Sequence, residues 1–184
     1  MTASHISTVS ILLAELLRAL NWRVASAESC TAGGIGYYLT ELSGASAWFA
    51  GGVMAYNNGV KQDTLGVSAE TLLQEGAVSE AVVAQMAQGV FKLMRTDCVV
   101  AVSGVAGPDG GSDDKPVGTV CFAWSWRDVV GNTHVRTHRD FFVGDRTQVR
   151  EQTVVQAMHG LIRLCECLLQ REQLVPERLI ASSV

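Results

Sequence analysis

Hydrophobic and polar positions along the chain switch between a helical period and a strand-like period, which predicts an α/β fold. Apolar residues recur at helical spacing over 6–20 and over 79–94, where Ser79 is placed to cap the second helix. Short apolar segments at 23–27, 51–56 and 98–103 predict strands, and the last is apolar and rich in β-branched residues, as a buried strand should be. Further helices are predicted over 32–42, 57–65, 68–73 and 147–170.

The second half of the chain predicts a glycine-rich loop followed by a β-hairpin. The loop covers 104–118, and the strands cover 117–126 and 134–143 around a turn that contains Gly131. No repeat, low-complexity tract or Pro-rich linker interrupts the pattern. We therefore expect one domain over residues 1–184, with a loose tail after about residue 176.

Charge and hydropathy exclude several classes of function. The formal net charge is −4 and basic clusters are absent, which argues against a nucleic-acid partner. The most apolar helical stretch, 11–20, is too short to cross a bilayer and contains Glu15 and Arg18, so no membrane partner is expected and the cytoplasm is the default location. Only 17% of residues are charged, which is consistent with a buried interface in a homo-oligomer.

Cysteine and histidine spacing gives no sign of a metal centre. The five cysteines are odd in number and irregularly spaced, and Cys165 and Cys167 lie on different sides of a helix. His134 and His138 share a strand face by parity, but a zinc ion would still lack a third ligand. We expect no metal and no cofactor.

One candidate for chemistry lies where the first strand ends and a helix is predicted to begin, at residues 27–34. A helix N-terminus offers unpaired N–H groups that can stabilise an oxyanion or hold a phosphate, and Gly33 and Gly34 allow close approach to the backbone. Taken alone, the pattern favours the commoner role, in which Ser29 or Thr31 caps the helix. Cys30 is interpreted as a small buried filler.

A lysine after the second strand is another candidate. Lys61 follows that strand by five residues and can point back across the same sheet edge, where a desolvated amine can act as a base. On position alone, a solvent-exposed helix lysine is favoured.

Two loops supply candidate ligand-binding groups. The segment 103–118 is dense in glycine after a buried strand, and ligand sites of α/β sheets form at the carboxyl ends of strands; an ordinary surface loop is an equal alternative. Neither a phosphate-binding Walker loop nor a dinucleotide fingerprint is present. Arg146 could grip a phosphate, or it could be a surface arginine paired with Asp145.

Taken together, these segments resemble the CinA C-terminal domain family. Matching stretches follow one another in family order over about residues 7–170: 27–31 (AESCT), 44–49 (GASAWF), 56–61 (YNNGVK), 65–67 (LGV), 76–80 (GAVSE), 103–111 (SGVAGPDGG), 115–120 (KPVGTV) and 144–146 (GDR). Ala32 stands where glycine is frequent in the family, and Gly59 replaces a common glutamate. Both departures leave Ser29 and Lys61 in place, and they put the substrate preference in doubt.

The resemblance implies a three-layer α/β/α domain with a mixed sheet and a serine–lysine mechanism. Characterised members of the family are nicotinamide-nucleotide amidohydrolases, which deamidate nicotinamide mononucleotide to nicotinate mononucleotide and ammonia. The resemblance also implies that Ser29 is the nucleophile and Lys61 its base. Tyr56 is expected to orient Lys61 or donate to the substrate, and Ser46 is the reserve nucleophile. Substrate binding is expected from Thr31, Gly33, Gly34, Asn58, Ser103, Gly104, Gly107 and Arg146, with the oxyanion held by amides near residues 31–34 or 104–107 and the phosphate by Arg146.

Two alternatives to this function stay open. One is a non-catalytic nucleotide-binding protein, associated with competence, which uses the same fold with an inert pocket. The other is an amidohydrolase that acts on a different small amide. The additional N-terminal domain of the longer family proteins is not matched, so the pyrophosphatase activity linked to it is not carried over.

Overall fold

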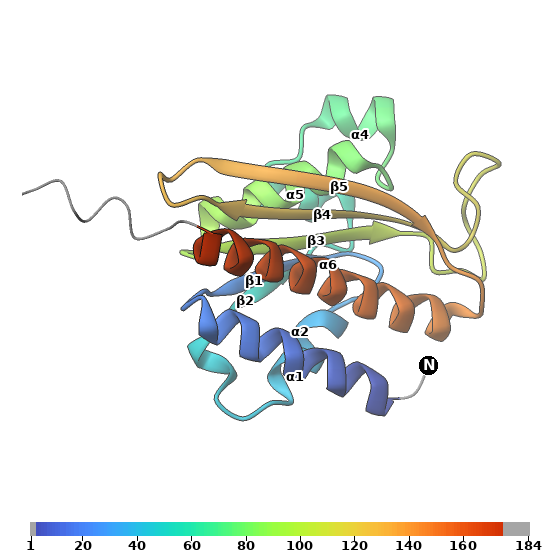
Figure 1. Ribbon diagram of the computed structural model, residues 1–184. Coiled ribbons are helices and arrows are strands. Elements are labelled where there is room, and N and C mark those ends of the chain that lie inside the picture. Colours follow the sequence, from blue (N-terminus) through green and yellow to red (C-terminus); the bar gives the residue numbers. More distant parts are fainter. Residues whose placement is uncertain (1–2, 175–184) are drawn as a thin grey trace, which may run out of the picture.

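The computed structural model describes residues 3–174, which form a five-stranded mixed sheet between two layers of helices (Figure 1). The strands are β1 (Val24–Glu28), β2 (Phe49–Met54), β3 (Cys98–Gly104), β4 (Thr119–Arg127) and β5 (Thr133–Phe141). The helices are α1 (Ala3–Ala19), α2 (Gly34–Thr40), the 3-10 turn η1 (Ala45–Ala47), α3 (Asn58–Asp63), α4 (Ala69–Glu75), α5 (Glu80–Leu93) and α6 (Arg146–Leu174). The predicted α/β/α architecture is confirmed.

The sheet has the strand order β2-β1-β3-β4-β5. β1 pairs in parallel with both β2 and β3, whereas β4 runs antiparallel to β3 and to β5. The carboxyl ends of β1, β2 and β3 therefore meet at one edge, where ligands bind in open α/β sheets. That edge carries the segments after residues 28, 54 and 104.

Alternate residues of the strands serve two separate cores. On one face, Val100 and Val102 pack with α1, α2 and α6. On the other face, Val99 and Ala101 pack against α5, together with apolar residues of the α3–α4 segment. Because β3 is buried on both faces, it reads as an apolar run rather than an alternating one, as the sequence predicted.

Predicted elements are present, and several boundaries differ. Ser79 accepts a hydrogen bond from the Val82 amide at 3.3 Å and so caps α5 as predicted. β2 begins at Phe49 instead of at residue 51 and ends at Met54 instead of at residue 56, so Tyr56 follows the strand. The last helix extends to Leu174, beyond the predicted end at 170. The tail expected after residue 176 lies outside the described residues.

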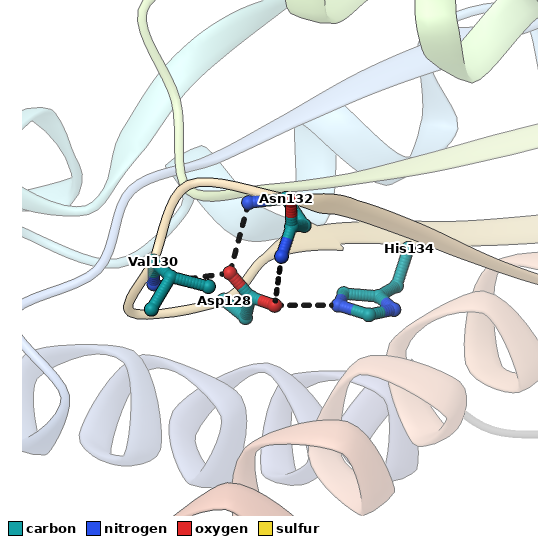
Figure 2. A network of polar contacts seen from close by, with 4 residues as sticks. All are labelled: Asp128, Val130, Asn132 and His134. Carbon is teal, nitrogen blue, oxygen red and sulfur yellow. Dashed lines mark hydrogen bonds and ion pairs between the residues drawn. The ribbon is translucent and has the colours of Figure 1, made fainter.

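Figure 2 shows the turn of the predicted β4–β5 hairpin, which is organised by Asp128. The carboxylate accepts hydrogen bonds from the Val130 and Asn132 amides at 3.1 and 2.8 Å, and its Oδ2 lies 2.8 Å from His134 Nε2. The contact with His134, helped by the Asn132 and Val130 donors, lowers the pKa of Asp128 to about 2. An ionised side chain therefore holds the turn that the sequence marked with Gly131.

None of the helices in the described part of the chain is long and apolar enough to cross a membrane.

Candidate active site

Ser29 lies directly beyond the carboxyl end of β1, in a turn that the neighbouring strand anchors. Its amide donates to the Val102 carbonyl of β3 at 3.1 Å, and the residue is only 7% exposed. The chain then turns through Ala32 and Gly33, which have φ angles of 51° and 90°. Because a right-handed helix cannot include left-handed residues, α2 begins at Gly34, and the predicted start at residue 32 is wrong.

The buried side chain of Glu28 accepts hydrogen bonds from backbone amides at the N-terminus of α2. The side chain is 2% exposed, and its Oε2 accepts from the Thr31 hydroxyl at 2.7 Å and from the Ile35 amide at 3.0 Å. Its Oε1 accepts from the Gly36 amide at 2.9 Å and from the Ser26 hydroxyl at 3.1 Å.

The helix start is therefore already bound to a carboxylate. A negative charge is stabilised there by the helix dipole and by the otherwise unpaired amides. The expectation of an oxyanion site at amides near residues 31–34 left out Glu28, which binds the neighbouring Ile35 and Gly36 amides. A carboxylate just before a strand-to-helix turn was the signal that could have identified the occupant.

Lys61 is buried, contrary to the exposed helix lysine that position alone favoured. The Asn57 side chain caps α3 by accepting from the Gly59 amide at 2.7 Å, and this start turns Lys61 toward β1. Lys61 is 1% exposed, and its Nζ donates to the Ala55 carbonyl at 2.8 Å and to the Tyr56 carbonyl at 3.2 Å.

The third contact of Lys61 Nζ is Ser29 Oγ, at 3.2 Å, although the two residues are 32 positions apart. Burial lowers the pKa of Lys61 below its ordinary value of 10.5 and outweighs the opposing influence of Cys30. Desolvation favours the uncharged amine, which is the form that can accept a proton. The tertiary structure thus joins a hydroxyl and a lysine whose pKa is shifted in the direction that a base requires.

A cavity of about 220 Å³ opens in front of this pair. Seven of the predicted site residues line it: Ser29, Tyr56, Asn58, Lys61, Ser103, Gly104 and Arg146. Cys30, Ala77, Val78 and Ala106 complete the lining and were not predicted as site residues. We call this space the Ser29 cavity.

Arg146 links three segments at the mouth of the Ser29 cavity. Its guanidinium donates to the Gly107 carbonyl at 2.7 Å and to the Tyr56 hydroxyl at 3.2 Å. Gly107 therefore contributes to the site through its carbonyl and not as part of the lining. Arg146 and Tyr56 are both exposed, so this corner is open to a ligand from solvent.

Four predicted site residues lie away from the Ser29 cavity. Thr31, Gly33 and Gly34 line a neighbouring hollow between α2 and α6, where Arg150 donates to the Thr31 carbonyl at 2.9 Å. Ser46 lies in η1, an exposed turn that precedes β2. Since β1 and β2 are parallel, Ser46 is at the opposite end of the strands from Ser29, far from Lys61.

Cys30 is adjacent to the hydroxyl but is chemically unlike a nucleophile. Burial raises the pKa of its thiol to about 12, so the thiol stays protonated at neutral pH. This agrees with its interpretation as a buried filler. Among residues 3–174, no group of three or more His, Cys, Asp or Glu side chains is arranged to hold a metal ion.

The chain is an α/β/α protein with a buried contact between Ser29 and Lys61 in a cavity at the carboxyl ends of its parallel strands, and comparison with known proteins gives the family. The model of the CinA C-terminal domain matches residues 7–165, and the chain belongs to this family. The nicotinamide-nucleotide amidohydrolase PncC of Escherichia coli K12 is 45% identical over 161 residues, which cover 88% of this chain and 95% of that protein. The protein of the same name from Pseudomonas putida is 46% identical over 159 residues, covering 86% and 96% of the two chains.

Solved structures agree. A CinA superfamily protein from Klebsiella pneumoniae superimposes with a TM-score of 0.82 at 37% identity, covering 88% of this chain and 98% of that chain. One from Escherichia coli gives 0.79 at 32% identity, with 89% and 93% covered.

Proposed function

We propose that this protein is a nicotinamide-nucleotide amidohydrolase, which hydrolyses the carboxamide of nicotinamide mononucleotide to a carboxylate and ammonia. The observation that carries the proposal is the 3.2 Å contact between Lys61 Nζ and Ser29 Oγ inside a cavity. The names and coverage of the PncC relatives support the substrate.

The surroundings of Lys61 suit a neutral amine. An uncharged amine has two N–H bonds and one lone pair. The Ala55 and Tyr56 carbonyls accept the two N–H bonds, which leaves the lone pair directed at the Ser29 hydroxyl. Lys61 then takes the Ser29 proton while Ser29 Oγ attacks the carboxamide carbon, and it returns the proton to the departing ammonia. Water hydrolyses the acyl-enzyme and restores both side chains.

The oxyanion is expected to face the start of the β3–β4 loop. The Ile35 and Gly36 amides of α2 already donate to Glu28, and the Ala32 and Gly34 amides donate to the Ser29 and Thr31 carbonyls. Gly104 and Ala106 line the Ser29 cavity, whereas the Val105 amide between them donates to the Thr119 carbonyl at 2.9 Å. We therefore assign the developing negative charge to the backbone donors of Gly104, Ala106 and Gly107. Arg146 is the group for the phosphate, because it lies at the open mouth and carries a planar fork of donors.

The test is ammonia release from nicotinamide mononucleotide. Ser29→Ala and Lys61→Met should each lower kcat by about 1,000-fold or more, the range seen when members of such catalytic units are removed. Met fills the buried position of Lys61 without a base. Ser46→Ala serves as the matched control and should keep wild-type kcat. Full activity of Ser29→Ala would eliminate the mechanism, and loss in Ser46→Ala alone would assign the chemistry to the reserve nucleophile.

Two further readouts separate the alternatives. A substrate panel that includes free nicotinamide compares catalytic efficiencies and would expose a preference for another small amide. Tight nucleotide binding by the wild-type protein without any turnover would favour a non-catalytic binding protein.

A further inference from the structure

A second cavity, of about 320 Å³, lies between β5 and the C-terminal half of α6. It shares no lining residue with the Ser29 cavity. Its floor is formed by Trp124 and Trp126. Trp126 pairs with His134 near the hairpin turn, so it lies at the end of β4, whereas Thr119 lies at the start of that strand. Gly104, at the active-site edge, pairs with Val120 at the start of β4. The two cavities therefore lie at opposite ends of the sheet, and we call this one the tryptophan cavity.

The aromatic floor of the tryptophan cavity is held in a fixed position. Trp124 Nε1 donates to the Ala157 carbonyl of α6 at 2.8 Å, and its ring stacks on Phe122 with centroids 5.4 Å apart. Gly160 permits this contact, because a Cβ at that position would lie 2.0 Å from Trp124 Cε2. Trp126 is half-buried and stacks on His134 at 5.3 Å. A planar group in the cavity thus meets a preformed aromatic surface.

The walls of the tryptophan cavity are basic. Arg136 lies on β5 directly opposite Trp124, and Arg163 projects from α6. Among the side chains that the structure describes, those of residues 5–170, no Asp or Glu lines the cavity, and neither guanidinium makes a hydrogen bond or ion pair with another of these residues. Asp140 on β5 accepts from Gln156 at 3.4 Å and lies 3.8 Å from His138, two residues that line the cavity. Two positively charged side chains therefore line one concavity of a protein whose net charge is −4.

We propose that the tryptophan cavity binds a small organic anion with a planar ring, whose phosphate or carboxylate is held by Arg136 and Arg163 and whose ring packs on Trp126. Guanidinium groups recognise such oxyanions through paired, charge-assisted hydrogen bonds, and aromatic rings stack favourably on tryptophan. A second copy of this chain whose two-fold axis passed through the cavity would fit less well, because it would bring like-charged arginines together.

Two phosphomonoester probes test the proposal, adenosine 5′-monophosphate and phenyl phosphate, with neutral adenosine as the uncharged counterpart. Binding is measured by titration calorimetry and by quenching of tryptophan fluorescence. Both phosphomonoesters should bind, and adenosine should bind at least about tenfold more weakly, because it lacks the charge-assisted hydrogen bonds. Arg136→Gln and Arg163→Gln should each weaken phosphomonoester binding by about tenfold.

Arg127→Gln is the matched control, because it removes one positive charge from the same hairpin at the ring of Phe91, away from the tryptophan cavity. Its affinity should stay within about twofold of wild type, since surface charges at a distance are screened by salt. The proposal is overturned if neither phosphomonoester binds saturably at millimolar concentration, or if Arg136→Gln and Arg163→Gln leave the affinity unchanged. Loss of binding only in Arg146→Gln would also overturn it, because the anion would then occupy the Ser29 cavity.

Discussion

Both oxygens of the buried Glu28 side chain should be needed as hydrogen-bond acceptors, and Glu28→Gln tests this. Each carboxylate oxygen accepts one backbone amide and one hydroxyl: Gly36 and Ser26 on Oε1, Ile35 and Thr31 on Oε2. In glutamine, one oxygen becomes an NH₂ group. The hydroxyl on that side can rotate and accept a hydrogen bond, but the backbone amide has no such freedom and loses its acceptor.

The magnitude follows from two contributions. A buried amide left without an acceptor costs about 1–3 kcal/mol. Loss of the negative charge at the N-terminus of α2 costs about 0.3–1 kcal/mol more. We therefore expect Glu28→Gln to lower the free energy of unfolding by about 1–4 kcal/mol. At an m-value of about 2 kcal/mol/M, this shifts a urea midpoint by about 0.6–2 M.

Equilibrium unfolding in urea at pH 7, followed by circular dichroism, measures the change. Ser26→Ala is the control, because it removes one hydroxyl donor and leaves both backbone amides bonded to the carboxylate. It should cost about 1 kcal/mol or less. A Glu28→Gln protein within about 0.5 kcal/mol of wild type would refute the reasoning, since it would mean that the amides of α2 do not depend on the charge.

Three further outcomes are expected. Because burial lowers the pKa of Lys61 below 10.5, kcat/KM for the amide should rise with pH and level off below pH 10.5. If kcat/KM instead fell as the pH rose toward 10.5, a neutral amine could not be the base. Gly160→Ala should lower the free energy of unfolding by about 2 kcal/mol or more, because the new Cβ would lie 2.0 Å from Trp124 Cε2. Urea titration measures the change, and an unchanged midpoint would show that α6 and the indole can separate without cost. The folded pKa of Asp128 is about 2 against an ordinary 3.8, so its contribution to stability is present above pH 3.8 and is lost as the pH falls through about 2. Asp128→Asn should therefore lose less stability than wild type between pH 5 and about pH 2, measured by urea midpoints, and equal losses would contradict the role of this carboxylate.

The order and type of the elements could be predicted from the sequence because they depend on local periodicity. The helical spacing of α5 and the Ser79 cap, and the uninterrupted apolar run of β3, are features of neighbouring residues. The hairpin around Gly131 is likewise a local signal. The resemblance to the family further predicted the α/β/α architecture and indicated Ser29 and Lys61 as a pair.

Boundaries and burial depended on contacts that the local pattern does not contain. α2 starts at Gly34 and not at residue 32, because Ala32 and Gly33 adopt left-handed conformations. Position alone assigned Lys61 to solvent, yet packing of α3 against the end of β1 buries it and gives its Nζ three oxygen partners.

The sequence by itself determined which residues could be nucleophile, base and phosphate ligand, because these are properties of side-chain chemistry and of the order of motifs along the chain. Only the tertiary structure decided which of them meet. Parallel pairing of β1 with β2 and β3 brings Ser29, Lys61 and Ser103 to one edge and leaves Ser46 at the other. The reason is that the direction of strand pairing, and not distance in sequence, sets which loop residues become neighbours.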